Sequence, residues 1–258
     1  MKDISQSEIL GSFRADLFKG QHIILSGATS GIGLDIARGF ASLGADVTAT
    51  GSSQTKIDGL TQEDPRIRFE VLDVRDREAV KAFCAKQTRC DVLVNGAGIA
   101  RGGAEWEEDI WLDTMEVNLN SQFRLAIGLK PLLAQSRGSI INIASMLSYM
   151  ADAEVPAYTA SKTGVLGLTR ALAHKWGREG IRVNAIAPGY HQTDMTKPIW
   201  SVPFGNKAVA DRTALGRWGT TLDLVGPALF LASPAAAYVT GMCLEVDGGF
   251  VSGNPLAE

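Results

Sequence analysis

The stretch that decides the fold is SGATSGIG, Ser26 to Gly33. It follows the apolar run HIIL, 22–25, and leads into LDIARGFASLG, 34–44, whose apolar residues recur at helical spacing. A strand, a turn with three glycines and a helix are therefore predicted in that order. In such a turn glycine lets the main chain approach a pyrophosphate, whose charge is favoured at a helix N-terminus. Close packing of the helix on the strand is the alternative reason for the glycines.

Short apolar runs recur along the whole chain and alternate with segments of helical period. The runs lie at 22–27, 45–50, 67–74, 90–98, 139–145, 181–189 and 243–249. The helical segments lie roughly at 31–43, 75–86, 107–135, 156–177 and 222–232. Nearly continuous apolar runs suit parallel strands that are buried on both faces. This pattern predicts a single α/β domain over residues 1–258, with a doubly wound, seven-stranded parallel sheet flanked by helices.

One segment departs from this pattern. Residues 190–207 hold two prolines, mixed polarity, Trp200 and Phe204, and resemble neither an ordinary helix nor a strand. We interpret this segment as a mobile substrate loop, with Trp200 and Phe204 on a lid. An additional surface loop of no importance is the alternative, although the two large aromatic side chains argue against simple exposure to solvent.

Composition limits the classes of function. The chain has 258 residues, 45% apolar content and a net charge of −3, which gives no basic patch for nucleic acid or anionic membrane. Three cysteines and three histidines are scattered, so neither a metal site nor a disulfide framework is expected. The polar opening and the lack of a long apolar run predict a cytoplasmic protein. Small-molecule chemistry is the class that remains.

Tyr158 and Lys162 stand four positions apart on a predicted helix, which places them on one face about 6 Å apart along the axis. A nearby ammonium stabilises a tyrosinate, so the phenol can exchange a proton with an alcohol. Ser145 ends the apolar run 139–145, at the sheet edge where a doubly wound fold presents ligand-facing groups. A packed aromatic beside a solvated lysine is the alternative for the pair alone, and Ser145 favours catalysis.

Several motifs together resemble the short-chain dehydrogenase/reductase family. They are the G-x-x-x-G-x-G turn, LDV at 72–74, NGAG at 95–98, PGYHQT at 188–193 and VDGG at 246–249. The stretches 141–162 and 183–233 are most similar to the branch of 2-deoxy-D-gluconate 3-dehydrogenases, 2-keto-3-deoxy sugar-acid dehydrogenases and gluconate 5-dehydrogenases. The resemblance implies a Rossmann-like fold and a nicotinamide-dependent interconversion of an alcohol and a ketone.

The resemblance also implies residue roles. Tyr158 would be the general acid or base, Ser145 would polarise the substrate oxygen, and Lys162 would lower the tyrosine pKa and bind ribose. Asn118, with Asn120 as a less well aligned alternative, would hold a water that links Lys162 to solvent. Asp73 would bind the adenine amino group. Gly96 replaces an asparagine of the family motif, which removes one amide that helps to lock the sheet. The cofactor-binding residues implied are Gly27, Thr29, Ser30, Gly31, Ile32, Gly33, Gly51, Ser52, Ser53, Asp73, Val74, Asn95, Gly96, Ala97, Tyr158, Lys162, Pro188, Gly189, Tyr190 and Thr193.

The choice between NAD and NADP depends on the end of the second strand. Gly51 occupies the place of the acidic residue that binds ribose hydroxyls, and Ser52 the place of the arginine that accepts a 2′-phosphate. Without a cation the charge-assisted part of phosphate binding is missing. Lys56 is able to supply one. The sequence therefore leans slightly to NAD and leaves use of both cofactors open.

For the substrate, the resemblance implies a sugar acid, a keto-deoxy sugar acid or a polyol. Relatives tend to carry an arginine pair after the N-A-G turn and asparagines after P-G-Y, whereas this chain has Arg101 alone and HQTDM, 191–195. A neutral polyol or a hydrophobic ketone therefore remains an alternative. The residues expected near the substrate are Ser145, Met146, Leu147, Tyr149, Val155, Tyr158, Tyr190 and His191.

Two other functions are compatible with the same motifs. A 3-oxoacyl thioester reductase shares the four catalytic residues, and a cofactor-sensing binding protein would share the fold without the chemistry. Gly164 and Gly167 are unfavourable inside a helix by roughly 1 kcal/mol each relative to alanine. Small residues let another helix approach closely, and in the family that the motifs resemble the corresponding helix packs against a second subunit. The resemblance therefore implies a homodimer or homotetramer.

Overall fold

Seven parallel strands form one sheet in the order β3-β2-β1-β4-β5-β6-β7. The structure is a computed structural model that describes residues 5–60 and 64–253. The strands are β1 His22–Ser26, β2 Asp46–Gly51, β3 Ile67–Val71, β4 Val92–Asn95, β5 Ser139–Ile143, β6 Arg182–Pro188 and β7 Cys243–Val246. Each predicted run overlaps one of them. The central strands β1, β4, β5 and β6 are buried almost throughout, as expected for strands covered on both faces.

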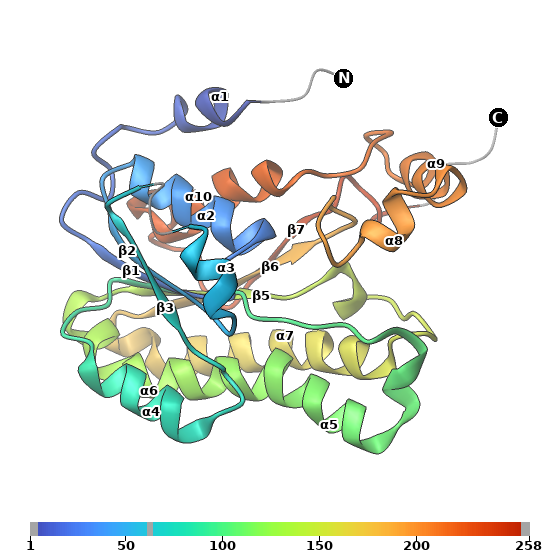
Figure 1. Ribbon diagram of the computed structural model, residues 1–258. Helices are drawn as coiled ribbons and strands as arrows, with labels where there is room; N and C mark the ends of the chain where they lie inside the picture. The colour runs from blue at the N-terminus through green and yellow to red at the C-terminus, as the bar shows by residue number, and fades with distance from the viewer. Residues whose placement is uncertain (1–4, 61–63, 254–258) are drawn as a thin grey trace.

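Helices cover both faces of the sheet (Figure 1). On one face lie α1 Gln6–Leu10, α2 Gly31–Ser42 and α10 Val225–Ala232, and on the other lie α4 Arg77–Lys86, α5 Glu108–Met115, α6 Ser121–Ser136 and α7 Pro156–Trp176. A short helix, α3 Gln54–Asp58, follows β2. Two large apolar cores fill the spaces between the sheet and its two helix layers. The Rossmann-like, doubly wound prediction is confirmed. No helix in the described residues combines the length and the apolar character needed to cross a membrane.

The structure corrects two predicted segments. The single helix expected over 107–135 is divided by a π-helical turn, Glu116–Asn120, between α5 and α6. Residues 190–207, expected to be neither helix nor strand, contain α8 Lys197–Trp200 and the start of α9 Pro203–Arg212. Both helices carry their proline in the first turn, where proline is tolerated because that N–H has no helical partner. The prolines that suggested a loop therefore mark two helix starts.

The direction of the strand connections reverses at β1, which lies between β2 and β4. A crevice forms at the carboxyl ends of the strands at such a reversal, and doubly wound proteins bind ligands there. Gly27 follows β1, Asn95 ends β4, and Ser145 stands two residues beyond β5. The topology thus brings the predicted motifs to one edge of the sheet.

Candidate active site

The glycine turn combines close packing with open space. A Cβ atom on Gly27 would lie 2.5 Å from the backbone nitrogen of Ala97, and one on Gly33 would lie 2.2 Å from the carbonyl oxygen of Gly27. Gly31 has φ +52°, and the nearest neighbour of a Cβ atom added there would be Thr193, at 3.8 Å. Gly27 therefore allows close packing against the segment after β4, and Gly33 allows α2 to pack closely on the residues after β1. Gly31 leaves its side free, which suits the approach of a phosphate.

Two cavities meet at this turn. The first, of about 210 Å³, extends toward Ser145, Tyr158 and Lys162, and the second, of about 290 Å³, extends toward Ser52, Asp73 and Arg75. Gly27, Ser30, Gly96 and Gly98 line both. A bent, two-ended ligand with its phosphates at the glycine turn fits this arrangement. All the predicted cofactor residues line one cavity or the other except Asn95 and Tyr190.

Ser145, Tyr158 and Lys162 converge at the first cavity. The side chains of Ser145 and Tyr158 are hydrogen-bonded to each other. The Nζ atom of Lys162 lies 5.6 Å from the centroid of the Tyr158 ring and donates a hydrogen bond to the carbonyl oxygen of Ile143 at 2.8 Å. The Ser145 hydroxyl also accepts from the backbone N–H of Leu147, at 3.1 Å, which fixes its rotamer. The three side chains form a hydroxyl–phenol–ammonium arrangement at the wall of a ligand-sized space.

Burial perturbs the titration of this group. It raises the pKa of Tyr158, and the hydrogen bond from Ser145 opposes that change. Burial lowers the pKa of Lys162 to about 8. A lysine that titrates near neutral pH beside a phenol is typical of a proton-transfer site.

Asn118 lies in the π turn and is fully buried. Its Oδ1 accepts from the backbone N–H of Ile99 at 2.8 Å, and its Nδ2 donates to the carbonyl oxygen of Ile99 at 2.9 Å and to Ser161 Oγ at 3.1 Å. The side chain therefore anchors the segment after β4 to α7. The water-holding role remains a prediction.

Close packing accounts for the glycine at position 96, where the family motif has an asparagine. A Cβ atom at this position would lie 2.8 Å from the carbonyl oxygen of Ser26, so a side chain requires the backbone to shift. The neighbouring Asn95 donates to Asn142 at 2.9 Å, and Asn142 donates to Thr169 at 2.9 Å. This buried chain of amides joins β4, β5 and α7 without the missing asparagine.

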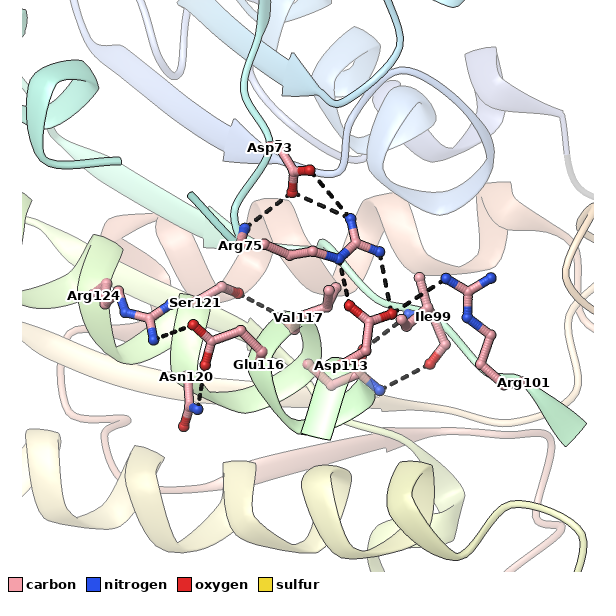
Figure 2. Close-up of polar contacts among 11 residues, drawn as sticks. Asp73, Arg75, Ile99, Arg101, Asp113, Glu116, Val117, Asn120, Ser121 and Arg124 are labelled. Carbon is pink, nitrogen blue, oxygen red and sulfur yellow. Dashed lines mark hydrogen bonds and ion pairs between the residues drawn. The ribbon is translucent and has the colours of Figure 1, made fainter. Parts of the chain in front are cut away.

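An ion-pair network lies at the end of the second cavity (Figure 2). Asp73 accepts hydrogen bonds from the backbone N–H of Arg75 at 3.0 Å and from its Nη1 at 3.2 Å. Arg75 Nε donates to Asp113 at 2.6 Å, and Arg101 Nη2 donates to the same carboxylate at 3.3 Å. Sequence reasoning missed Arg75, whose only signal was its position two residues after Asp73. The guanidinium of Arg101 is directed to Asp113 and does not line the first cavity.

The packing at the end of β2 accounts for the glycine at position 51. A Cβ atom on Gly51 would lie 2.4 Å from Thr29 Oγ1, so any larger residue here requires Thr29 or the end of β2 to shift. Ser52, Ser53 and Lys56 line the same cavity. No ion pair holds Lys56 within the described part of the chain.

The predicted substrate residues separate into three groups. Ser145 and His191 line the first cavity, as does Met195, which sequence reasoning missed. Tyr149 does not line it, and its hydroxyl is hydrogen-bonded to Cys243 and Glu245 of β7. The others belong to an apolar group that we term the substrate-side cluster. It comprises Met146, Leu147, Met150, Val155, Tyr158, Tyr190, Trp200, Val209, Ala210, Trp218, Phe250 and Val251.

The lid residues differ from each other. Trp200 packs in the substrate-side cluster and donates its ring N–H to the carbonyl oxygen of Thr193 at 2.9 Å. Phe204 is 85% exposed. Trp218 donates its ring N–H to the carbonyl oxygen of Asn206 at 2.9 Å, which ties α9 to the cluster. The mobility of this segment remains a prediction.

Comparisons with known proteins show the family of the chain and its overall fold. A family model described as enoyl-(acyl carrier protein) reductase matches residues 27–251. The 2-dehydro-3-deoxy-D-gluconate 5-dehydrogenase of Bacillus subtilis is 43% identical over 243 residues, which cover 91% of this chain and 96% of that protein. The 3-oxoacyl-(acyl-carrier-protein) reductase of Vibrio cholerae is 36% identical, with 90% and 97% covered. A gluconate 5-dehydrogenase from Burkholderia cenocepacia, solved with NADP and tartrate, superposes with a TM-score of 0.85 at 34% identity, with 93% and 99% covered.

Proposed function

The chain belongs to the short-chain dehydrogenase/reductase family and is an oxidoreductase, and we propose that it interconverts a secondary alcohol and a ketone on a sugar acid or keto-deoxy sugar acid. The observation that carries the proposal is the convergence of Ser145, Tyr158 and Lys162 on the cavity that continues from the glycine turn. A nicotinamide bound there would supply the hydride acceptor or donor.

The residues of this chain then supply the proton chemistry. The Tyr158 phenol gives a proton to the substrate oxygen during reduction and removes it during oxidation. The Ser145 hydroxyl, hydrogen-bonded to that phenol, orients the same oxygen. The Lys162 ammonium, beside the Tyr158 ring, stabilises the tyrosinate. The site thereby opposes the rise in tyrosine pKa that burial causes.

The substrate class is supported by the sugar-acid dehydrogenases among the relatives, which exceed the thioester reductase in identity. Arg101 is paired with Asp113, which does not favour recognition of a carboxylate by its guanidinium and keeps a neutral polyol as the second candidate. The assembled Ser145, Tyr158 and Lys162 group disfavours a sensor without chemistry, because cofactor sensing needs no proton transfer.

The proposal includes both nicotinamide cofactors. NAD is slightly favoured because neither Gly51 nor Ser52 carries a cation. Lys56, which lines the same cavity, supports acceptance of the 2′-phosphate of NADP. Relatives solved with bound NADP support this second use.

The proposal also covers assembly and location. A homodimer or homotetramer is supported by exposed apolar side chains on the helix layer of α5 and α6, where Leu112 is 56%, Phe123 47% and Ile127 48% exposed. A cytoplasmic location is supported by three free cysteines, because thiols persist in a reducing compartment.

The test is a panel of sugar acids, polyols and simple secondary alcohols with NAD and NADP, followed by the absorbance of the reduced nicotinamide. Tyr158→Phe is expected to lower kcat by about 100-fold or more while cofactor binding persists. Folded Tyr158→Phe with near-normal turnover would show that the assignment is wrong. Turnover of polyols without turnover of sugar acids would show that the substrate is a polyol and not a sugar acid.

A further inference from the structure

Glu105 is a buried carboxylate that the proposed chemistry does not use. It lies in a short 3-10 segment, Gly102–Trp106, after β4, and its side chain is 0% exposed. Asp91 and Glu105 are the buried acidic residues of the described chain, and Asp91 is paired with Arg89 at 2.6 Å. No ion pair within the described residues holds Glu105. A buried carboxylate without a cation is unfavourable by several kcal/mol unless hydrogen bonds replace its water.

Two backbone N–H groups supply those hydrogen bonds. Glu105 Oε1 accepts from the N–H of Arg101 at 2.9 Å, and Oε2 accepts from the N–H of Tyr158 at 2.8 Å. Tyr158 is the third residue of α7, and N–H groups in the first turn of a helix have no partner inside the helix. Val155, the N-cap residue, makes no side-chain cap hydrogen bond. Glu105 therefore caps α7 from a distant segment, where the helix dipole also favours its negative charge.

The capped N–H belongs to the same residue as the proton-transferring phenol. We propose that Glu105 is a positioning residue for Tyr158, because its carboxylate holds the first turn of α7 against the segment after β4. This inference rests on the proposed function. A second bond joins the segment after β4 to the residues that precede α7, since Trp106 Nε1 donates to the carbonyl oxygen of Ala153 at 3.0 Å. Small displacements of reacting groups lower rates strongly, so fixing this backbone fixes the distance from the phenol to the substrate oxygen.

The position requires a carboxylate, because both oxygens face donors. Glutamine has almost the same shape, but its amide offers one acceptor oxygen and one NH2 donor. Whichever way the amide turns, the NH2 faces an N–H group, either that of Arg101 or that of Tyr158. Glu105→Gln is thus a near-isosteric change that removes one of the two contacts.

The charge of Glu105 gives the inference a second readout. The groups that act electrostatically on the Tyr158 phenol are Ser145 after β5, Tyr190 after β6 and Glu105, and the Lys162 Nζ atom lies beside its ring. Glu105 and Tyr190 raise the pKa of Tyr158, in addition to burial. Removing the negative charge in Glu105→Gln therefore lowers the pKa of Tyr158. The rise of kcat/KM with pH in alcohol oxidation, which requires the phenolate, should move to lower pH.

The experiment compares Glu105→Gln with Glu107→Gln, an exposed neighbour that serves as the matched control. For Glu105→Gln we expect kcat to fall about tenfold or more, an unchanged cofactor Kd, and a pH profile displaced to lower pH. Glu107→Gln should match the wild type in all three. Unchanged kcat and an unchanged pH profile in folded Glu105→Gln would overturn the proposal.

Two further measurements keep the test decisive. If Glu105→Gln does not fold, Glu105→Asp keeps the negative charge but shortens the side chain by one methylene group, so the carboxylate cannot reach both N–H groups. An unchanged kcat in folded Glu105→Asp would overturn the proposal. Ultraviolet titration of Tyr158, taken as the difference from Tyr158→Phe, needs no substrate. A titration unaltered by Glu105→Gln would reject this inference, whereas absence of turnover by the wild type would reject the proposed function instead.

Discussion

At the scale of single residues, Lys162 shows how the proposed chemistry and stability oppose each other. Its ammonium is buried, and burial lowers its pKa from an ordinary value of 10.5 to about 8. The unfolded chain therefore binds more protons than the folded chain between these pH values. Stability rises with pH in that interval, and below it the unfavourable burial of the charge is fully present.

Lys162→Met is accordingly expected to lower kcat by about 100-fold or more and to raise the free energy of unfolding at pH 7. The gain is at most about 3 kcal/mol, reduced by loss of the hydrogen bond to Ile143. The difference from the wild type should narrow as pH rises from 8 toward 10.5. Urea unfolding across this pH range measures the difference in the free energy of unfolding. Lys175→Met, at an exposed position on the same helix, is the control. A difference that does not depend on pH would contradict the explanation.

Lys56 provides the residue-scale prediction for cofactor choice. Lys56→Ala is expected to lower kcat/KM for NADP about tenfold and to leave the value for NAD unchanged, because only the 2′-phosphate would form a charge-assisted hydrogen bond with the ammonium. Steady-state kinetics with both cofactors measures the effect. Lys81→Ala, an exposed lysine on α4, is the control. Equal losses of kcat/KM with NAD and NADP would show that Lys56 supports the structure and does not recognise the 2′-phosphate.

At the scale of elements, the sequence predicts the segments whose pattern is set by burial. The central strands are continuous apolar runs because both their faces are covered, and that composition is visible in one sequence. The π turn at Glu116–Asn120 is not visible, because its flanking residues keep helical backbone angles. The helices α8 and α9 are missed because proline in a segment of mixed polarity suggests a loop.

The candidate site is also predictable only in part. Ser145, Tyr158 and Lys162 stand at fixed places relative to a strand or helix, so their convergence follows from the pattern. Glu105 does not, because it is one of three nearby glutamates that all resemble exposed residues of a polar loop. Only the tertiary contact with α7 buries it and leaves Glu107 and Glu108 in solvent. Tyr149 does not line the first cavity, and its place near the substrate stays a prediction.

Helix α7 also corrects the reason given for one glycine. The assembly prediction attributes both Gly164 and Gly167 to a second subunit, yet a Cβ atom on Gly164 would lie 2.8 Å from Leu119 Cδ2 of the same chain. Gly164 is therefore needed for packing against the π turn. Gly167 has no such neighbour: apart from its chain neighbours and the adjacent backbone of α7, no described atom lies within 4 Å of its Cβ position.

The contact with Leu119 predicts that the effect of Gly164→Ala on the free energy of unfolding changes sign when Leu119 is shortened. Gly164→Ala should lower the free energy of unfolding by about 1–2 kcal/mol, because the added methyl group overpacks the contact with Leu119. In the Leu119→Ala background the same substitution should raise it by up to about 1 kcal/mol, the intrinsic helix preference for alanine. A double-mutant cycle by urea unfolding measures both. Equal effects in the two backgrounds would show that Leu119 is not the constraint.

At the scale of the whole molecule, the helix layers differ in what they expose. Leu112 on α5 and Phe123 and Ile127 on α6 are about half exposed, and these helices lie on the same side of the sheet as α7 with Gly167 (Figure 1). Apolar side chains gathered on one layer favour association with another protein surface. The proposed homo-oligomer would cover this layer.

Phe123→Glu and Gly167→Glu are therefore expected to reduce the sedimentation coefficient to that of a monomer at micromolar concentration. Within one chain both side chains have room, so the monomer should remain folded by circular dichroism. Phe204→Glu, on an exposed aromatic of α9, is the control and should leave assembly unchanged. A wild-type chain that sediments only as a monomer would exclude the assembly.

The substrate-side cluster has a consequence for how this enzyme changes over evolutionary time. Its members pack with one another and are distinct from the two large cores that set the sheet and carry the glycine turn. Because Tyr158 is itself a member of this cluster, mutations in α8, α9 and the segment after β6 can change the surroundings of the phenol while the two large cores and the glycine turn stay intact. New specificities become accessible by exchange of this module, which makes the same segments a natural target for laboratory selection.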